Sequence, residues 1–248
     1  MSKNQWDPQA YVTHASFVSE LGKPTLALLD PQPSEHILDI GCGDGTLTKM
    51  IADANAYPIG IDANINMVES TRAKGIKAYH LDATNFSFDQ KFDAVFSNAA
   101  LHWVKDHNSM LSNTAKVIKK NGRFVAEFGG IGNVASIISA IDTVLNKYNI
   151  EYTNPWYFPD PENYKLKLSQ FGFNTKYITT YSRPTRLNTT LTDWLNTFGD
   201  DFFIKVPESD KHSIIDEISR LAANTLYRDK KWYADYVRIQ FIAHFDGN

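Results

Sequence analysis

The chain has 248 residues, of which 43% are hydrophobic and 21% charged, and its formal net charge at pH 7 is −3. This composition is typical of a globular protein and argues against a nucleic-acid or anionic-membrane partner. No apolar run reaches the ~18 residues of a membrane span, and the polar start "MSKNQWDPQAY" lacks the apolar segment of a signal peptide. The single cysteine, Cys42, excludes an internal disulfide. We therefore expect a cytoplasmic protein with no membrane partner, and leave its oligomeric state open.

Short apolar runs and amphipathic segments alternate from residue 37 to residue 130. The expected strands are "HILDIG", "YPIGID", "IKAYHLD", "FDAVFSN" and "RFVAEFG". "HILDIG" is an apolar run without polar alternation, which is typical of a strand buried on both faces, and "YPIGID" is interpreted as a second buried strand. Helical spacing follows the first, second and fourth runs, and the last of these helices is expected to end at Asn121-Gly122. The alternation predicts a doubly wound α/β fold with a mostly parallel sheet.

The second half of the chain is less regular. An apolar stripe from Val134 to Tyr148 predicts a helix, and "NTKYITTY" and "VRIQFIAHF" predict two further strands. A direct hairpin needs only ~2–5 linking residues, so the long stretch between these strands, around residues 184–232, predicts an inserted helical cap. We expect one domain, made of an N-terminal helical lid (1–30), a cofactor-binding half (31–130) and a substrate half (131–248) that carries the cap.

The stretch "ILDIGCGDGTLTKMIA" places Gly41, Gly43 and Gly45 between the first strand and the first helix. Ligands of open parallel sheets bind outside the carboxyl ends of the strands. Glycines at this edge permit positive φ and let a ligand lie against the backbone. The turn therefore predicts either a ligand site or, more plainly, a tight strand-to-helix turn.

Three acids, Asp39, Asp62 and Asp82, lie at or near the ends of the first three strands. Asp62 follows Gly43 by 19 residues, close to the spacing of about 20 at which dinucleotide folds place a ribose-binding acid. The turn reads Gly-x-Gly-x-Gly, and Asp44 at the expected helix start would repel a pyrophosphate. We therefore favour a nucleoside with an amine. A NAD-dependent oxidoreductase and a non-catalytic nucleoside-binding module are the alternatives from other classes.

Five segments between residues 37 and 128 together resemble the class I S-adenosylmethionine-dependent methyltransferases. They are "ILDIGCGDGTLT", "GIDAN", "HLDATNF", "FDAVFSNAALHWV" and "KKNGRFVAEF", in that family's order and spacing. The resemblance implies a Rossmann-like, seven-stranded sheet with an antiparallel last strand. It also implies S-adenosyl-L-methionine as cofactor and S-adenosyl-L-homocysteine as product. "FSNAALHWVKDH" and "WDPQAY" are most similar to the trans-aconitate methyltransferase group, whose members esterify a carboxylate of a small acid.

The same resemblance implies which residues bind the cofactor. They are Asp39, Gly41, Cys42, Gly43, Asp62, Ala63, Met67, Asp82, Ala83, Asn98 and Ala99. Asp39 would face the methionine part with the two glycines of the turn, Asp62 would hold the ribose, and Asp82 would meet the adenine edge. Asn98 would lie beside the methyl group. We interpret Cys42 as a packing residue within the turn.

In-line methyl transfer to a carboxylate needs no general base, because that acceptor is ionised at neutral pH. We expect O-methylation of a carboxylate on a small molecule, with N- or C-methylation of another small acceptor as the alternative. His102 follows the fourth strand. It is either a catalytic base or substrate hydrogen-bond donor, or a histidine that braces its loop beside Trp103.

The candidate substrate-binding residues are Tyr11, His14, Trp103, Trp156 and Arg183. Arg183 and Arg186 offer guanidinium groups to an anionic acceptor, although solvated surface arginines are the commoner case. The aromatic residues of the loop and cap either line an apolar acceptor pocket or form the core of the cap. They are Trp156, Tyr157, Phe158, Trp194, Phe198, Phe202 and Phe203. No histidine forms a metal-ligand spacing with Cys42, so we expect no metal.

Overall fold

The computed structural model describes residues 20–247, so the lid expected over residues 1–30 is described only from residue 20. The main strands are β1 (His36–Ile40), β2 (Tyr57–Asp62), β3 (Lys77–His80), β4 (Phe92–Asn98), β5 (Ile118–Gly129), β6 (Phe173–Arg186) and β8 (Lys231–Phe245). They form one sheet in the order β3-β2-β1-β4-β5-β8-β6. β1 to β5 pair in parallel, whereas β8 is antiparallel to both β5 and β6. This confirms the mostly parallel α/β sheet with an antiparallel last strand.

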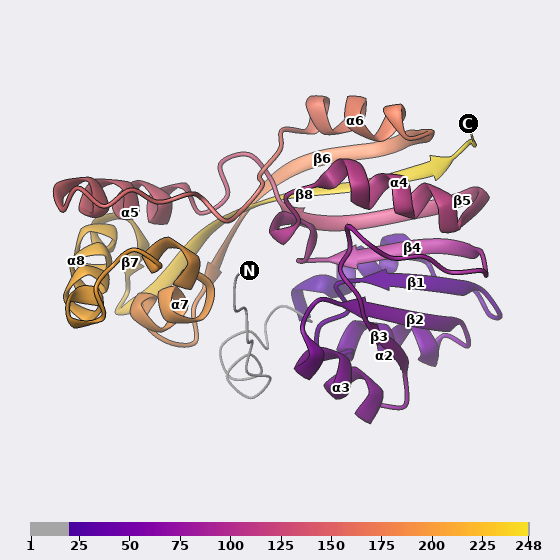
Figure 1. The fold of residues 1–248 in the computed structure, drawn as a ribbon, viewed down its shortest axis with the longest axis horizontal. Helices are drawn as coiled ribbons and strands as arrows, with labels where there is room; N and C mark the ends of the chain where they lie inside the picture. Colours follow the sequence, from indigo (N-terminus) through magenta and orange to yellow (C-terminus); the bar gives the residue numbers. More distant parts are fainter. Residues whose placement is uncertain (1–19, 248) are drawn as a thin grey trace.

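Helices cover both faces of the sheet (Figure 1). On one face, residues 20–29 form a helix that packs beside α2 (Thr46–Asp53), with Leu29 and Ile51 against Phe96 of β4. On the other, α4 (His107–Val117) and α6 (Pro161–Gln170) cover the apolar side chains of β4, β5 and β8. α3 (Ile65–Ala73) lies against β2 and β3. Each helix within residues 20–247 is too short or too polar to span a lipid bilayer.

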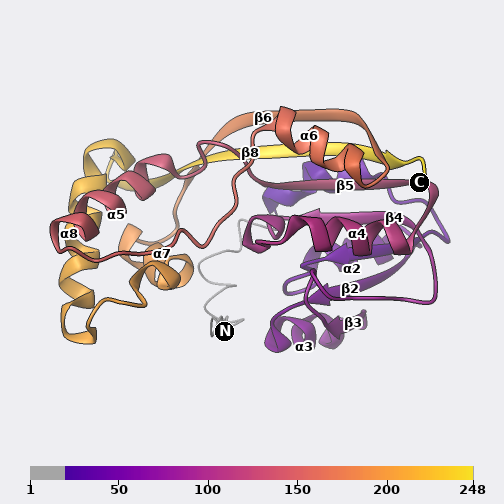
Figure 2. The same ribbon diagram turned by 45° about the horizontal axis from the view of Figure 1, so that its top comes forward.

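A second apolar cluster forms the cap at one end of the molecule (Figures 1 and 2). Its helices are α5 (Ala135–Lys147), α7 (Leu191–Phe198), α8 (Glu208–Leu226) and a 3₁₀ turn (Asp200–Phe203). The two-residue strand β7 (Tyr227–Arg228) pairs with β8 there. β6 and β8 continue from the sheet into the cap and stay paired as far as Arg186 and Tyr233. The cap therefore combines the stretch between β6 and β8 with α5, which precedes both strands.

One local prediction is wrong. Asn121-Gly122 does not end the helix, because α4 already ends at Val117 and β5 begins at Ile118. Asn121 has φ 64° inside β5, where the pairing with β4 is irregular between Phe92 and Ala94. The same left-handed preference that ends helices here accommodates extra residues within a strand.

Candidate cofactor and acceptor site

A single cavity of about 680 Å³ begins at the carboxyl ends of the parallel strands and extends to the cap. Its sheet end is lined by Gly41, Gly43, Asp62, Ala63, Met67, Asp82, Ala83, Asn98 and Ala99. Its cap end is lined by His102, Trp103, Trp156, Phe158, Trp194, Phe198, Tyr236 and Arg238. The structure thus brings nine of the expected cofactor residues to one end and two of the expected substrate residues, Trp103 and Trp156, to the other.

The glycine turn needs its glycines for two different reasons. Gly41 has φ 74°, and a Cβ there would lie 2.2 Å from the Cβ of Ala100. Gly43 has φ 55°, but a Cβ there would meet nothing within 4 Å, so its bare backbone faces open space. Because Gly43 also lines the cavity, a ligand can rest directly on this peptide.

Asp62, at the end of β2, is bound to the glycine turn. Its Oδ2 accepts a hydrogen bond from the Gly43 amide (3.0 Å), and its Oδ1 accepts one from the Asn64 amide (2.8 Å). Burial raises the pKa of Asp62, although these two amides oppose the shift. A carboxylate has about four lone-pair sites, so Asp62 can still accept the hydroxyls of a ribose.

Asn98 and Asp82 complete the polar part of the sheet end. The Oδ1 atom of Asn98 is buried with no hydrogen-bond partner among the described residues, so a ligand donor such as an ammonium group would satisfy it. Asp82 holds its loop by accepting from the Thr84 amide and hydroxyl, both at 2.7 Å. A bare backbone, a ribose-type acid and an unsatisfied amide oxygen together fit an amino-acid-tailed nucleoside.

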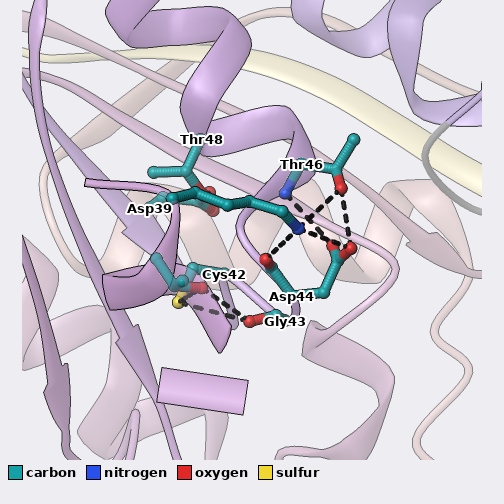
Figure 3. A network of polar contacts seen from close by, with 8 residues as sticks. Asp39, Cys42, Gly43, Asp44, Thr46 and Thr48 are labelled. Carbon is teal, nitrogen blue, oxygen red and sulfur yellow. Dashed lines mark hydrogen bonds and ion pairs between the residues drawn. The ribbon is translucent and has the colours of Figure 1, made fainter. Parts of the chain in front are cut away.

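Two expected cofactor residues lie behind the turn instead of lining the cavity. Asp39 is 2% exposed and its Oδ2 accepts from the Thr48 hydroxyl at 2.6 Å (Figure 3). Burial, aided by the charge of Asp62, raises the pKa of Asp39 to about 7. Cys42 is buried, with its Sγ 3.7 Å from the Thr71 hydroxyl. Asp39 therefore supports the turn from within the protein, and the position of Cys42 agrees with a packing role.

Asp44 does not present the unbalanced negative charge that was expected to repel an anionic ligand. Its Oδ2 lies 2.8 Å from Lys74 Nζ, and the carboxylate accepts from the amide and hydroxyl of Thr46 (Figure 3). Burial by itself would raise the pKa of Asp44, but the Lys74 ammonium and these hydrogen bonds outweigh it and lower the pKa, and the ammonium balances the charge. Asp44 therefore does not leave a net negative charge at the start of α2.

His102 lines the cap end as a neutral imidazole. It is 8% exposed, and burial lowers its pKa well below the usual value, with a further contribution from the charge of Arg238. Its Nδ1 accepts from the Gly129 amide at 3.4 Å, so we assign the proton to Nε2. In this tautomer His102 can donate a hydrogen bond to a ligand, whereas its acceptor nitrogen is occupied.

Arg183 does not line the cavity, which corrects its assignment as a substrate residue. Its Nη1 lies 2.7 Å from Glu127 Oε1 and donates to the Leu21 carbonyl oxygen at 3.2 Å. Arg183 therefore joins β6 to β5 and to the helix over residues 20–29. Tyr11 and His14 lie outside the described residues.

Arg238 of β8 lines the cavity and is a residue that the sequence reasoning missed. In "VRIQFIAHF" it alternates with the apolar Val237 and Ile239, a pattern typical of a strand with one solvent-exposed face. In the structure Arg238 is 4% exposed. The available signal was the long insertion before β8, which covers this face.

The aromatic residues divide between the two roles expected for them. Trp156, Phe158, Trp194 and Phe198 line the cavity, while Phe202 and Phe203 pack in the core of the cap. Trp156 and Trp194 belong to both groups, because they are 6% and 4% exposed and are also part of the apolar cluster of the cap. Tyr157 instead packs on His107, toward the core of the sheet domain.

Comparisons with known proteins agree with this geometry. The family model described as a methyltransferase domain matches residues 38–126. An uncharacterized methyltransferase of Schizosaccharomyces pombe is 35% identical over 98% of this chain and 99% of its own. A trans-aconitate 2-methyltransferase of Rhodococcus jostii is 34% identical over 43% of this chain and 42% of its own. The structure of the YcgJ protein of Bacillus subtilis aligns with a TM-score of 0.62 at 16% identity, over 94% of this chain and 100% of that one, which shows a shared fold. The chain therefore belongs to the class I S-adenosylmethionine-dependent methyltransferases.

Proposed function

We propose that this enzyme methylates a carboxylate oxygen of a small organic acid held between the sheet and the cap. The observation that carries the proposal is the single cavity, which joins the Asp62 end to an aromatic end that contains the buried guanidinium of Arg238. A mostly apolar space with a few polar groups is typical of a small-molecule site. A desolvated cation within it favours an anionic acceptor.

S-adenosylmethionine supplies an activated methyl group when bound, so the protein mainly positions the acceptor and excludes water. Asp62 and the bare backbone of Gly43 would hold the nucleoside, and Asn98 would bind beside the reacting end. Trp103 and Trp156 would wall off the acceptor from water. Holding two reactants in line can account for ~7–11 kcal/mol of a barrier.

The protonation state of His102 favours an acceptor that is already ionised. The Gly129 amide occupies Nδ1 of His102, and Nε2 already carries a proton. Neutral His102 can therefore donate a hydrogen bond from Nε2 but has no free nitrogen to accept a proton from the acceptor. An alcohol or an ammonium acceptor must lose a proton before or during transfer, whereas a carboxylate need not. This supports carboxylate O-methylation over N-methylation.

The relatives support the same acceptor class over part of the chain. The Rhodococcus jostii protein is named for trans-aconitate, a small acid, but it matches less than half of either chain. The acceptor that binds at the cap end must therefore be identified by experiment on this protein. Membership of the methyltransferases sets aside the oxidoreductase and non-catalytic alternatives.

The test is methyl transfer from S-adenosylmethionine labelled in the methyl group to a panel of mono-, di- and tricarboxylic acids. Methyl esters release volatile methanol in mild base, whereas N- and C-methyl products do not. We expect the transferred label to be base-labile. Base-stable label would contradict ester formation and would favour the N- or C-methylation alternative.

A further inference from the structure

Arg238 carries a buried positive charge with no carboxylate of its own. Its side chain is 4% exposed, and its Nε atom is buried without a hydrogen-bond partner. No carboxylate of residues 20–247 forms an ion pair with it, and its Cζ lies 4.5 Å from the centre of the Tyr236 ring. Burying an unpaired charge is costly, and an anionic ligand that pairs with Arg238 would offset that cost.

The neighbouring carboxylate, Glu127, is fully used by other groups. Its Oε1 lies 2.7 Å from Arg183 Nη1. Its Oε2 accepts from Thr25 Oγ1 and Gln240 Nε2, each at 3.0 Å, and from the hydroxyl of Tyr181. Of the two guanidinium groups in this part of the protein, only that of Arg183 is paired with Glu127. The excess positive charge lies at Arg238, which lines the cavity.

Arg238 and His102 belong to the same end of the cavity. Arg238 is the register partner of Gly129 on β5, and the amide of Gly129 donates to His102 Nδ1. Around them the cavity is lined by Trp156, Trp194 and Tyr236. In such apolar surroundings a guanidinium binds an oxyanion more strongly than it would in water. The arrangement has the charge and the surroundings that would suit an anionic group.

The chemistry of methyl transfer indicates which anionic group this is. As the carboxylate oxygen attacks the methyl carbon, the C–S bond breaks and the negative charge of the oxygen is cancelled. A guanidinium bound to that oxygen would lose its partner on the way to the transition state and would stabilise the ground state more. A guanidinium bound to a different anion of the same molecule would keep its partner throughout.

We propose that Arg238 binds a second, non-reacting anionic group, so that the acceptor carries at least two. The proposal rests on the proposed function for the identity of the reacting group. The binding site itself follows from the charge balance described above. The second group is an oxyanion, either a carboxylate or a phosphate.

The test measures binding by isothermal titration to protein saturated with S-adenosylhomocysteine. The probes are glutarate and trans-aconitate as polycarboxylates, glycerol 3-phosphate and inorganic phosphate as phosphates, and butyrate as the monoanion. The variants are Arg238→Met, which keeps the side-chain volume, and Arg238→Lys, which keeps a charge but not the fork. Arg186→Met is the matched control, because Arg186 of β6, which the sequence also offered to an anionic acceptor, is exposed and lies outside the cavity lining.

We expect the wild type and Arg186→Met to bind at least one multiply charged probe tenfold or more tightly than butyrate. Arg238→Met should lose that preference, and Arg238→Lys should keep part of it. The unliganded Arg238→Met protein should melt no lower than the wild type, since the substitution removes an unpaired buried charge. If both Arg238 variants fail to bind S-adenosylhomocysteine, then Arg238 supports the fold and the proposal is overturned.

The two proposals fail in different ways. If no multiply charged probe binds the wild type at millimolar concentration, or if Arg238→Met keeps the preference, the anion site is overturned even where acids are esterified. If the preference depends on Arg238 but no acid accepts a methyl group, the anion site stands and the proposed function is wrong. A preference for polycarboxylates over the phosphate probes, or the reverse, identifies the oxyanion.

Discussion

Asp62 links the glycine turn to the cavity, because one carboxylate accepts from the Gly43 amide and lies at the ligand surface. We expect Asp62→Ala to weaken S-adenosylhomocysteine binding at least tenfold, about 1.4 kcal/mol. The fold should survive, since the core lies elsewhere. Titration calorimetry measures the affinity, and Asp53→Ala, an exposed acid on α2, is the control. An unchanged affinity would remove the ribose role of Asp62.

His102 offers a test of acceptor chemistry by pH. Its pKa is lowered well below the usual value, and a carboxylate acceptor is ionised above pH 6. We therefore expect kcat/KM to be flat from about pH 6 to 9 and His102→Gln, which keeps an N–H donor, to retain activity within about tenfold. A catalytic base contributes ~10²–10⁴-fold. A larger loss in His102→Gln together with a rate that rises with pH would establish His102 as a base.

Asp39 should make the folded protein less stable as the pH rises, which is opposite to the effect of a carboxylate with a lowered pKa. Its folded-state pKa of about 7 lies above the unfolded value of about 3.9, so the native state binds the proton more tightly. Its contribution to the free energy of unfolding is therefore greatest in acid and declines as the pH rises through 4 to 7. We measure the free energy of unfolding in urea at pH 5 and at pH 8. From pH 5 to pH 8, the value for Asp39→Asn should rise relative to that of the wild type by on the order of 2 kcal/mol. A constant difference would contradict the raised pKa.

At the scale of elements, the sequence predicted the structure best where a residue pattern is compatible with only one kind of element. Continuous apolar runs predict strands buried on both faces, and the spacing of Gly41, Gly43 and Asp62 places a ligand at their ends. The helix end predicted at Asn121-Gly122 was wrong, because a residue with a left-handed backbone conformation occurs both at helix ends and at irregularities within strands. Arg183 was assigned to the substrate and Arg238 was missed, because no local pattern says which of the two arginines pairs with Glu127.

Glu127 joins elements that are far apart in sequence. From β5 it binds Thr25 of the N-terminal helix, Tyr181 and Arg183 of β6, and Gln240 of β8. Glu127→Ala would leave Arg183 without a carboxylate, and loss of one partner of a buried ion pair costs about 3–5 kcal/mol. We expect a clearly lower midpoint of thermal unfolding.

Glu217→Ala is the matched control, because it breaks a solvent-exposed pair with Lys147 at 2.6 Å. Exposed pairs contribute little, so the midpoint should barely move. Equal effects of the two substitutions would show that Glu127 has no special role in joining the elements.

For the whole molecule, the cap was the part that the sequence described least completely. The insertion between the strands was expected, but α5 also packs into the cap cluster from an earlier part of the chain. An amphipathic stripe shows that a helix has a partner without showing which one. The cavity therefore emerges only when both chain segments are placed around the long β6–β8 pair.

Ligand binding should be visible in the stability of the whole protein. A ligand at ~100 times its dissociation constant stabilises the native state by about 2.7 kcal/mol. For a chain of this size the midpoint should rise by roughly 5–11 °C with S-adenosylhomocysteine and not with NAD. Differential scanning fluorimetry compares the two ligands in parallel. A rise with NAD alone would contradict the cofactor assignment.

The β6–β8 pair also bears on how this enzyme is related to others that use the same cofactor. The segment between the strands leaves at Arg186 and returns at Tyr233, and these two residues are partners in the ladder. A segment with adjacent exit and return points can be lengthened, shortened or exchanged in evolution without altering the order of strands. The match to the shared methyltransferase domain ends at Ala126, before any part of the cap. Exchange of this segment would replace Trp194 and Phe198 in the cavity wall and leave the sheet end of the cavity, with Gly43 and Asp62, unchanged.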